Sequence, residues 1–534
     1  IISIVIRAYH ITSIPQLNAD EAALGYNAYS LIETGKDEFG TSWPFVFKSF
    51  DDYKPGIYVY LTIPFVRVWG LNALAVRFPS LIASIISVLT IYFLARRIYA
   101  TSRHRDTIGL ISSLILAIMP WHIHFSRGAW ETQVATAFLL LGTYFFLIIP
   151  KKRKYIFLGL MMYFLALYTY HSMRVLVPLF ILYWVIRYRK IWLKARILAI
   201  SAMGFCLLAS IPLGLQITNN SGLSRAQGVS IFADSGPIWR SNEIRNDHSI
   251  PTSIWVKLAY NKPVLYSNKF FANYVEHFSM KFLFYDGDTI QRNRVPQFGQ
   301  LLFVNFIFIL AGLWYLIRQL PKRWSLLVFW LLVSPIPSAL TFQSPHAVRA
   351  FSLTIPLALV TAYGIVNLIS TIKLKKGNFI ASIIVLGITS IYIWDFSRYL
   401  VNYYLLLPYH YPDATQNGFN QLVPWVESVK QDYNKIIITD QYDQPYILFL
   451  FYSQYSPKLF QSQAKISPQD KFGFGTVRQY DNYKFQKIDF NLLNQTEEKI
   501  LLIGTQDEIP DTANIVNNIY DKYDRIIFRI AQIN

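Results

Sequence analysis

The sequence of 534 residues is too long for one compact domain, and its 53% of hydrophobic residues beside only 15% of charged ones argues against an ordinary soluble protein. The net charge of +19 is carried largely by short Lys and Arg clusters between apolar runs. This distribution argues against a nucleic-acid partner and is typical of the cytoplasmic loops of membrane proteins. The single cysteine, Cys206, excludes intrachain disulfides and a cysteine-based metal site.

The first polar stretch, residues 7–74, begins with a helix signal. Asn18 is a typical helix N-cap, Asp20 and Glu21 fall in the following first turn, and Gly35 is a typical helix end. Apolar residues recur at helical spacing between these limits, so the stretch predicts an amphipathic helix at the membrane interface. A second short amphipathic segment is expected after a Lys-Pro-Gly sequence later in the same stretch.

Ten apolar runs further along the chain are each about long enough to cross a bilayer. Together with a truncated first span at residues 1–6, they predict a polytopic α-helical membrane protein of about eleven spans. The runs lie near residues 76–95, 107–121, 133–150, 155–170, 175–186, 197–217, 299–317, 325–342, 351–370 and 378–395.

Five basic clusters fall on alternate connections between these runs, so one side of the predicted membrane domain collects them. The positive-inside rule makes that side cytoplasmic, in a multi-pass protein of the plasma membrane. The outer side then receives residues 7–74, the long loop 218–298 and the C-terminal tail. The clusters lie at residues 96–105, 151–154, 187–196, 318–323 and 373–376.

The chain from 396 to 534 is more polar and rich in Tyr, Gln and Asn. Because short apolar runs alternate with helical patterns, we expect a small extracytoplasmic α/β domain here, after a transmembrane domain at 1–395. Strands are predicted near 435–439, 499–504 and 525–530, and helices near 421–432, 443–452 and 512–522.

Asp20 and Glu21 are adjacent carboxylates beside the predicted membrane surface. Acids in a first helical turn favour the helix dipole, and that alone would account for them. The sequence Asp51-Asp52-Tyr53-Lys54-Pro55 in the same loop favours a functional role over capping alone, because a lysine close to the interface can bind a lipid phosphate as a point charge. Snorkelling of the lysine toward the headgroups is the ordinary alternative.

Further ionisable residues collect on the predicted outer side. Arg77 heads a span, where an arginine either anchors the helix or acts in function. His122 and His124 lack a third ligand at metal spacing, so we expect no metal site. Arg127 and Glu131 are spaced for an i,i+4 pair on a helix. The other candidates are His171, Arg174, Asp286, Asp288, Arg292, His346 and Arg349.

These motifs, in this order, resemble the lipid-phosphate-sugar-dependent glycosyltransferases of the GT-C type, in particular bacterial protein O-mannosyltransferase-like and aminoarabinose-transferase-like enzymes. The resemblance covers about residues 1–395. Relatives commonly carry Lys-Pro-Pro where this chain has Lys54-Pro55-Gly56, which puts the local loop shape in question. The Trp-Trp-Asp motif of oligosaccharyltransferases does not occur, so transfer of a whole glycan to Asn is not expected. The resemblance is carried by Ala19-Asp20-Glu21-Ala22, Tyr53-Lys54-Pro55, Arg77-Phe78-Pro79-Ser80, Phe125-Ser126-Arg127-Gly128-Ala129, and Asp286-Gly287-Asp288 with Arg292 and Gly299 after it.

The resemblance implies an enzyme that takes a sugar from a polyprenyl-phosphate carrier in the membrane lipid. It passes the sugar, usually with inversion and without a metal or other cofactor, to a protein, lipid or glycan acceptor outside the cytoplasm. Asp20 matches the catalytic acid and Lys54 the lysine near the carrier phosphate. An acceptor hydroxyl must lose a proton and a leaving phosphate needs cations, so we expect Asp20 to act as the base. The expected residues are Asp20, Glu21 and Glu131 for catalysis; Lys54, Arg77, Arg127, Arg174 and Arg349 for the phosphate; and Asp52, Tyr53, His124, His171, Asp286, Asp288, Arg292 and His346 for substrate binding.

A transporter or flippase of lipid-linked sugars is the main alternative. Such a protein would place ionisable residues near mid-span and show internal repeats or broken paired helices. The ionisable residues of this chain crowd one side instead, and no repeat is evident, which favours the enzyme. A non-catalytic scaffold whose tail binds partners is a third interpretation, disfavoured by the many acids and bases on the outer side.

Overall fold

The computed structural model describes residues 1–50, 52–150, 152–218, 228–246, 254–468, 475–493 and 498–533. The chain packs into two compact units, each assembled from segments that are distant in the sequence. This division differs from the predicted boundary at residue 395, because the second unit joins the first polar stretch to the tail. The first unit contains Ile1–Arg7, Ile82–Ser126 and Glu131–Tyr403, and the second contains Ala8–Leu81, Arg127–Trp130 and Tyr404–Asn534.

Helix α2 (Ala19–Thr34) is the first long element of the second unit, after the short α1 (Ile2–Ala8) at the start of the chain. The Asn18 side chain accepts a hydrogen bond from the Glu21 N–H, and the Glu21 carboxylate accepts one from the Asn18 N–H. This capping box gives partners to two backbone N–H groups that have none within the helix. Gly35 ends the helix with a φ of 69°, a left-handed conformation that favours glycine. The predicted helix and both of its ends are confirmed, whereas its position at the membrane interface stays a prediction.

A short β-hairpin follows α2 and carries Lys54. Strand β1 (Val46–Ser49) pairs antiparallel with β2 (Asp52–Pro55), and Phe47 stands opposite Lys54. Helix α3 (Ile57–Trp69) begins directly after Gly56 and packs against α2. It is the second amphipathic segment that the sequence predicts.

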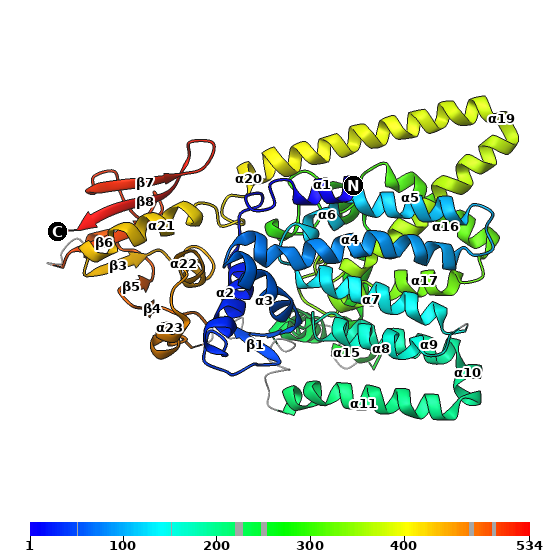
Figure 1. Ribbon diagram of the computed structural model, residues 1–534, viewed down its shortest axis with the longest axis horizontal. Helices are drawn as coiled ribbons and strands as arrows, with labels where there is room; N and C mark the ends of the chain where they lie inside the picture. Colours follow the sequence, from blue (N-terminus) through cyan, green and yellow to red (C-terminus); the bar gives the residue numbers. More distant parts are fainter. Residues whose placement is uncertain are drawn as a thin grey trace. The chain divides into compact units, whose positions relative to one another are not determined.

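The tail forms a mixed sheet in the order β4-β5-β3-β6-β8-β7, drawn in orange and red in Figure 1. Its central strands β5, β3 and β6 are parallel, and β8 and β7 continue the sheet antiparallel. The strands are β3 (Lys435–Ile438), β4 (Gln479–Tyr480), β5 (Tyr483–Phe485), β6 (Ile500–Gly504), β7 (Ile515–Tyr520) and β8 (Ile526–Ile533). The helices are α21 (Phe419–Val429), η6 (Lys430–Asp432), α22 (Pro445–Ser453), α23 (Pro457–Gln463) and α24 (Phe490–Leu493).

Most elements predicted for the tail coincide with observed ones. The three predicted strands overlap β3, β6 and β8, and the first two predicted helices overlap α21 and α22. The helix predicted at 512–522 is wrong, because these residues contain strand β7. Its β-branched Ile515, Val516 and Ile519 suit a strand, and pairing with β8 outweighs the helical spacing.

The ten apolar runs predicted as spans lie largely in helices. Helix α19 (Thr354–Val401) contains two of these runs, since two helices meet at Gly377, where φ is 84°. The other helices are α4 (Ala73–Ile98), α5 (Arg105–Ile118), α7 (Glu131–Ile148), α8 (Tyr155–Leu167), α9 (Met173–Arg187), α11 (Arg196–Thr218), α16 (Asn305–Gln319), α17 (Trp324–Val333) and α18 (Ile336–Ala339).

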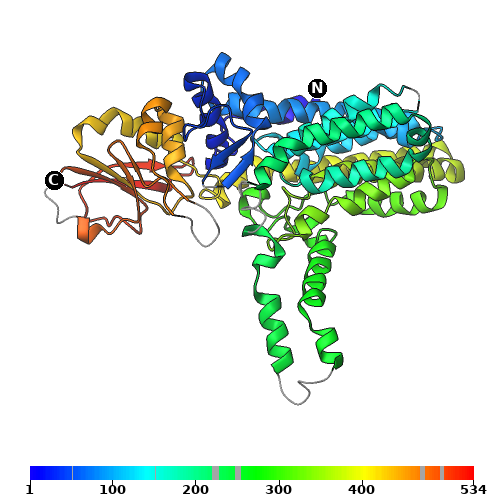
Figure 2. The ribbon, with the colours of Figure 1, turned by 90° about the horizontal axis from the view of Figure 1, so that it is seen from below.

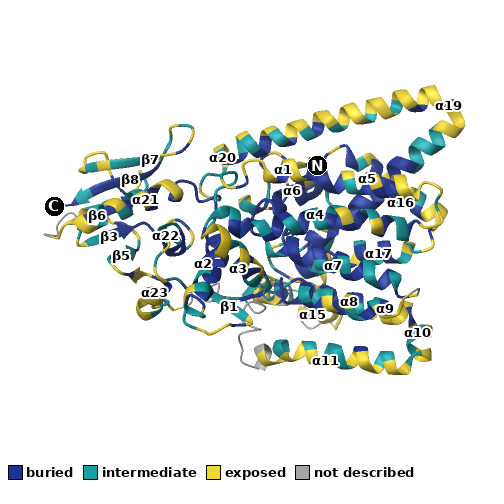
Figure 3. Cartoon of the chain, viewed as in Figure 1, coloured by how far each residue is buried: buried dark blue, intermediate teal, exposed yellow. Residues whose placement is uncertain are grey.

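Among the described residues, four helices are long and apolar enough to cross a membrane. The number is five if α5 and α6 (Pro120–Ser126), bent by 60° where they meet, form one span. Several shorter apolar helices, such as α8 and α16, fall below that length, so the total of about eleven spans stays a prediction. Figure 3 shows α11 and the part of α19 after Gly377 as largely exposed, as expected of helices that face lipid.

Shorter elements fill the connections of the chain. One group follows α11 in the long loop predicted at 218–298, part of which lies outside the described residues. The connecting elements are α10 (Arg189–Lys194), η1 (Ile231–Ala233), α13 (Gly236–Asn246), α14 (Ile254–Ala259), α15 (Lys262–Glu276), η2 (Lys281–Tyr285), η3 (Gln291–Asn293), η4 (Phe351–Leu353), η5 (Asn402–Leu406) and α20 (Leu407–His410).

Candidate active site

The start of α2 carries the two adjacent acids, and the fold gives each of them a different cation. Nζ of Lys54 lies 2.5 Å from Oδ1 of Asp20, with 30% of the Asp20 side chain and 11% of the Lys54 side chain exposed. Oppositely charged groups at this distance form a charge-assisted hydrogen bond. The structure therefore brings the predicted base and the predicted phosphate-binding lysine into one pair.

The backbone beside Lys54 accounts for the glycine that replaces the second proline of the Lys-Pro-Pro motif. The Gly56 N–H donates to the Phe45 carbonyl oxygen at 3.2 Å, a bond that a proline cannot make. A Cβ at this position would lie 2.8 Å from the Phe47 ring. The departure from the motif therefore fits the packing of the hairpin. Lys54 also lies against an aromatic ring, with Nζ 5.0 Å from the centroid of Phe50.

Glu21 pairs with Arg77 instead. Nη2 of Arg77 lies 2.6 Å from Oε2 of Glu21 and Nε lies 2.8 Å from Oε1, a two-point contact with 3% of Glu21 and none of Arg77 exposed. Oε1 also accepts the Ala129 N–H at 2.6 Å, and Oε2 accepts the Asn18 N–H at 3.2 Å. Glu21 thus joins the start of α2 to α4 and to the segment that contains Ala129.

The remaining donors of Arg77 bind the chain that leads into α2. Nη1 donates to the Ile11 and Pro15 carbonyl oxygens, and Nη2 donates to the Gln16 carbonyl oxygen. A buried guanidinium with this many acceptors fixes the geometry of its neighbours. The Glu21–Arg77 pair therefore sets the position of the peptide that carries Asp20.

The segment 127–130 differs from its prediction. Helix α6 ends at Ser126 and α7 begins at Glu131, so Arg127 and Glu131 do not share a helix, and the predicted i,i+4 arrangement is wrong. Arg127 is fully buried. Its Nη2 donates to the Ile14 carbonyl oxygen at 2.9 Å, and its guanidinium lies 5.0 Å from the ring centroid of Tyr404.

Glu38 is a buried acid that the sequence reasoning missed. Oε1 of Glu38 accepts a hydrogen bond from Nδ2 of Asn27 at 3.2 Å, and the Glu38 N–H donates to Oδ1 of Asn27 at 3.0 Å. Burial raises the pKa of Glu38 to about 8, aided by the charge of Asp37, while Asn27, Lys54 and Tyr446 oppose the shift. The sequence signal that could have identified Glu38 is its position directly after Asp37, just beyond the helix end at Gly35.

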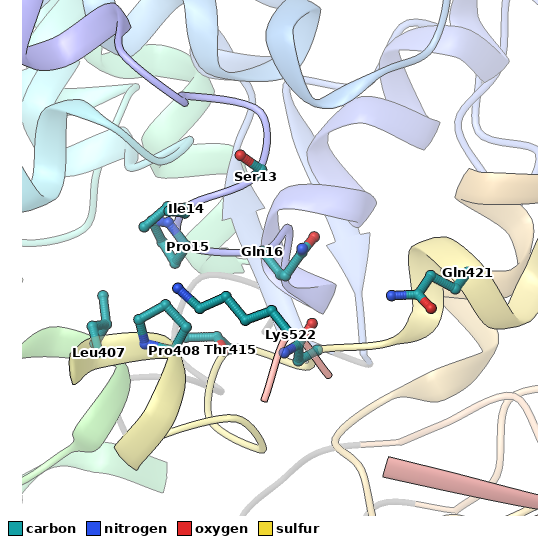
Figure 4. A pocket seen from close by; sticks show the side chains of 10 residues that line it. Ser13, Ile14, Pro15, Gln16, Leu407, Pro408, Thr415, Gln421 and Lys522 are labelled. Atoms are coloured by element: carbon teal, nitrogen blue, oxygen red, sulfur yellow. The ribbon is translucent and has the colours of Figure 1, made fainter. Parts of the chain in front are cut away.

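The tail contributes a polar contact at the same helix start. Oε1 of Gln416 accepts the N–H of Ala19, the first residue of α2, at 2.6 Å. Nearby, residues 13–16 and the loop after α20 line a cavity of about 100 Å³, shown in Figure 4. Lys522 extends into this cavity, and its Nζ donates to the Tyr404 carbonyl oxygen at 3.3 Å. No predicted site residue lines this cavity.

In the first unit, Asp288 joins two loops. Its Oδ2 accepts from the Ala347 N–H at 2.6 Å and from Nδ2 of Asn293 at 3.1 Å, and its Oδ1 accepts from the Ile290 N–H at 2.9 Å. The side chain is fully buried, and this burial raises the pKa of Asp288, although the N–H donors oppose the rise. Asp288 therefore holds the loop after η2 against the segment that carries His346 and Arg349.

Two predicted histidines of this unit have defined partners. Nδ1 of His346 accepts the Val348 N–H at 3.3 Å and lies 3.6 Å from Oδ2 of Asp288. His124 contacts the Arg292 carbonyl oxygen through Nε2 at 2.9 Å, which ties α6 to the loop around η3.

The other predicted residues occupy element ends and loops. Nη1 of Arg349 donates to Oγ1 of Thr341 at 2.7 Å. Asp286 is largely exposed, and its Oδ2 lies 3.9 Å from Nζ of Lys281. The side chain of Asp52 lies outside the described part of the structure, although its backbone is in β2. The remaining residues are Tyr53 in β2, Glu131 at the start of α7, His171 in the turn before α9 and Arg174 in the first turn of α9, all of them half-buried.

The predicted site residues thus fall into two groups, one in each compact unit. Within each group the structure shows direct contacts, as in the Asp20–Lys54 pair and the Asp288 loops. Over the described ranges of the chain, no three His, Cys, Asp or Glu side chains gather as metal ligands would. The second-unit group is Asp20, Glu21, Asp52, Tyr53, Lys54, Arg77 and Arg127, and the first-unit group is His124, Glu131, His171, Arg174, Asp286, Asp288, Arg292, His346 and Arg349.

Comparison with known proteins adds a family and a fold. Residues 54–215 match the model of the dolichyl-phosphate-mannose-protein mannosyltransferase family. The matched segment contains Lys54, Arg77 and Arg127. A search of curated protein sequences finds no match.

Solved structures of similar fold include two of ArnT from Cupriavidus metallidurans, one in the apo state and one bound to undecaprenyl phosphate. Both have a TM-score of 0.55 at 11% identity, and they cover 99% and 100% of this chain and 96% of ArnT. AglB from Archaeoglobus fulgidus, an archaeal oligosaccharyltransferase, has a TM-score of 0.49 at 12% identity over 85% of this chain and 62% of its own. Residues 54–215 therefore resemble this mannosyltransferase family, and the fold is similar to that of ArnT, in agreement with the resemblance noted in the sequence.

Proposed function

We propose that this protein transfers a glycosyl group from a polyprenyl-phosphate-linked sugar to an acceptor on the extracytoplasmic side of the plasma membrane, with inversion and with Asp20 as the base. The observation that carries the proposal is the Asp20–Lys54 pair, a partly exposed carboxylate beside an ammonium group at the start of α2. The family match over residues 54–215 supports a lipid-phosphate donor. So does the ArnT structure bound to undecaprenyl phosphate.

The chemistry needs one proton acceptor and at least one cation. The acceptor hydroxyl attacks the anomeric carbon while the bond from that carbon to the phosphate oxygen breaks, and the bonding electrons leave with the polyprenyl phosphate. The hydroxyl proton passes to the Asp20 carboxylate, and the Lys54 ammonium stabilises the negative charge that develops on the phosphate. Attack from the face opposite the phosphate inverts the anomeric centre.

The proposal distinguishes residues that contact the substrates from residues that hold these catalytic residues in position. Lys54 is the phosphate-binding residue of this proposal, and the partly exposed Arg174 and Arg349 keep their predicted role as phosphate ligands. The fully buried Arg127, predicted for the same role, is assigned to positioning instead. Glu131 is a second catalytic acid. We assign Glu21 and Arg77 to positioning, because their hydrogen bonds to each other and to the backbone occupy them inside the second unit. Sugar and acceptor would contact Asp52, Tyr53, His124, His171, Asp286, Arg292 and His346. Asp288, predicted for the same role, is fully buried and is assigned to positioning of the loops.

The test measures sugar transfer and hydrolysis from radiolabelled polyprenyl-phosphate sugars by the purified protein in lipid. Asp20→Asn should lower turnover by about 10²–10⁴-fold, the range typical of a lost general base. Glu33→Gln is the matched control, because Glu33 is an exposed acid at the far end of the same helix and should leave turnover unchanged. Transfer by Asp20→Asn at the wild-type rate would refute the assignment of the base.

The same experiment tests the transporter alternative. Carrier-lipid binding without turnover of any donor would favour a transporter or flippase of lipid-linked sugars. Turnover that depends on Asp20 but leaves the configuration of the sugar unchanged would retain the enzyme and refute inversion.

A further inference from the structure

Three helices of the long loop form an arm, which we define as residues 236–246 and 254–276, the helices α13, α14 and α15. Oγ of Ser241 in α13 donates to the Tyr260 carbonyl oxygen at 2.6 Å. The Tyr266 hydroxyl of α15 donates to the Asp234 carbonyl oxygen just before α13, at 3.0 Å. In Figure 2 these green helices extend away from the long helices of the first unit and run across their direction.

The base of the arm is attached at one end of an apolar helix. The Tyr274 hydroxyl donates to the Leu332 carbonyl oxygen at 2.7 Å, close to the last residue of α17. Nδ2 of Asn273 donates to the carbonyl oxygens of Ala339 and Thr341 in the connection that follows. The opposite end of α17 begins next to Lys322 and Arg323, one of the basic clusters. The arm therefore starts at the end of α17 remote from that cluster, where an apolar helix would leave the lipid.

The arm presents apolar side chains outward. On α15, Phe271 and Val275 are four residues apart, so they share one helix face, and both are exposed. The other face of α15 is buried through Tyr266 and Asn273. The aromatic side chains of the other two helices are more exposed still, with Trp239 at 73% and Trp255 at 75%.

We propose that the arm lies in the headgroup region of the outer leaflet, with its apolar side chains inserted into the lipid. The attachment to α17 places it at the level where that helix ends, and its direction across the long helices suits an element that lies in the plane of the membrane. Trp and Tyr side chains prefer this interface. Leu332, beside the attachment point, is itself exposed, so the exposed apolar surface continues onto the apolar helix α17.

The charges of the arm fit the same partner. Lys257, Lys262 and Lys269 lie among the exposed aromatic residues of α14 and α15, where their ammonium groups can reach lipid phosphates while their stems stay in the apolar layer. Helices of this composition bind membrane surfaces with the apolar face inserted. The proposal concerns attachment to lipid and does not depend on glycosyl transfer.

The test uses spin labels in the full-length protein, reconstituted in nanodiscs of zwitterionic and anionic phospholipid. Cys206→Ser provides a background without cysteine, and labels are placed at Trp255→Cys and Val275→Cys. Leu207→Cys on the exposed side of α11 is the lipid control, and Lys458→Cys on α23 is the water control. We expect the arm labels to be accessible to oxygen and shielded from a soluble nickel complex, at a depth of about 5–10 Å below the phosphates.

Two outcomes would overturn the proposal. Nickel accessibility at residues 255 and 275 equal to that at residue 458 would place the arm in water. Labels that are shielded from both reagents, with a defined distance between the labels of two copies, would show that the arm binds a second copy of the chain. If a cysteine variant fails to fold, brominated lipids provide the second measurement: they should quench a smaller share of the fluorescence in Trp255→Phe than in the wild type.

Discussion

The two ion pairs at the start of α2 differ in one respect that separates their roles. Glu21 and Arg77 are buried, bind each other at two points and share further hydrogen bonds with the backbone. Asp20 directly precedes Glu21 on α2 and pairs with Lys54 of β2, but 30% of the Asp20 side chain stays exposed. The buried pair can stabilise structure and has no approach for a substrate. The partly exposed pair can exchange one partner for a ligand.

The two adjacent acids at the start of α2 therefore have different partners and different roles. Asn18 and Glu21 form the capping box, so the second acid of the motif is engaged by the helix start as well as by Arg77. The first acid points to the hairpin that carries Lys54. In the proposed function Glu21 is the positioning acid and Asp20 the reactive one, and the following variants test that division.

The largest effect is expected at the buried pair. Arg77→Met leaves the Glu21 carboxylate buried without its cation, which should destabilise the second unit by about 3–5 kcal/mol. Thermal unfolding in detergent, followed by intrinsic fluorescence, measures this change. Asp20→Asn is the matched comparison, because its pair is partly exposed and should change the unfolding temperature far less. Equal unfolding temperatures for Arg77→Met and the wild type would contradict a structural role for the buried pair.

The next effect is expected on the donor. Lys54→Met removes the ammonium beside Asp20 and should weaken donor binding by about 10- to 100-fold, the equivalent of one charged hydrogen bond. The KM for the lipid-linked donor measures this loss, and the KM for the acceptor serves as the internal control. Lys54→Arg keeps the charge and should recover part of the affinity. A donor KM unchanged in Lys54→Met would contradict the role of this lysine at the phosphate.

The smallest effect concerns Glu38, a buried acid of the same polar stretch. Its pKa of about 8 lies above the ordinary carboxyl value, so the folded state keeps a proton that the unfolded state has released between about pH 4.5 and 8. Its contribution to stability is therefore fully present below pH 4.5 and is lost as the pH rises toward 8. Glu38→Gln cannot ionise, and its unfolding temperature should exceed that of the wild type by about 2 °C or more at pH 8. At pH 5 the gap should be much smaller. A gap that does not change with pH would show that Glu38 is ionised in the folded state.

Local signals made part of this site predictable. The cap at Asn18, the acids after it and the stop at Gly35 are encoded within one helix, and α2 begins and ends where they indicate. The apolar runs likewise coincide with helices, because hydrophobic length is a property of a single segment. Strand β7 was missed because its structure depends on pairing with β8, which no helical pattern in residues 512–522 reveals.

The sequence by itself determined where most helices of this protein lie, because its apolar runs coincide with them. Its composition and the order of its motifs predicted a membrane glycosyltransferase with Asp20 and Lys54 as central residues. The tertiary structure alone decided which cation each acid would pair with. Glu21 meets an arginine 56 residues away, Asp20 meets a lysine 34 residues away, and Ala19 meets a glutamine 397 residues away. Such pairings depend on burial and distance in space, which spacing along the chain does not contain.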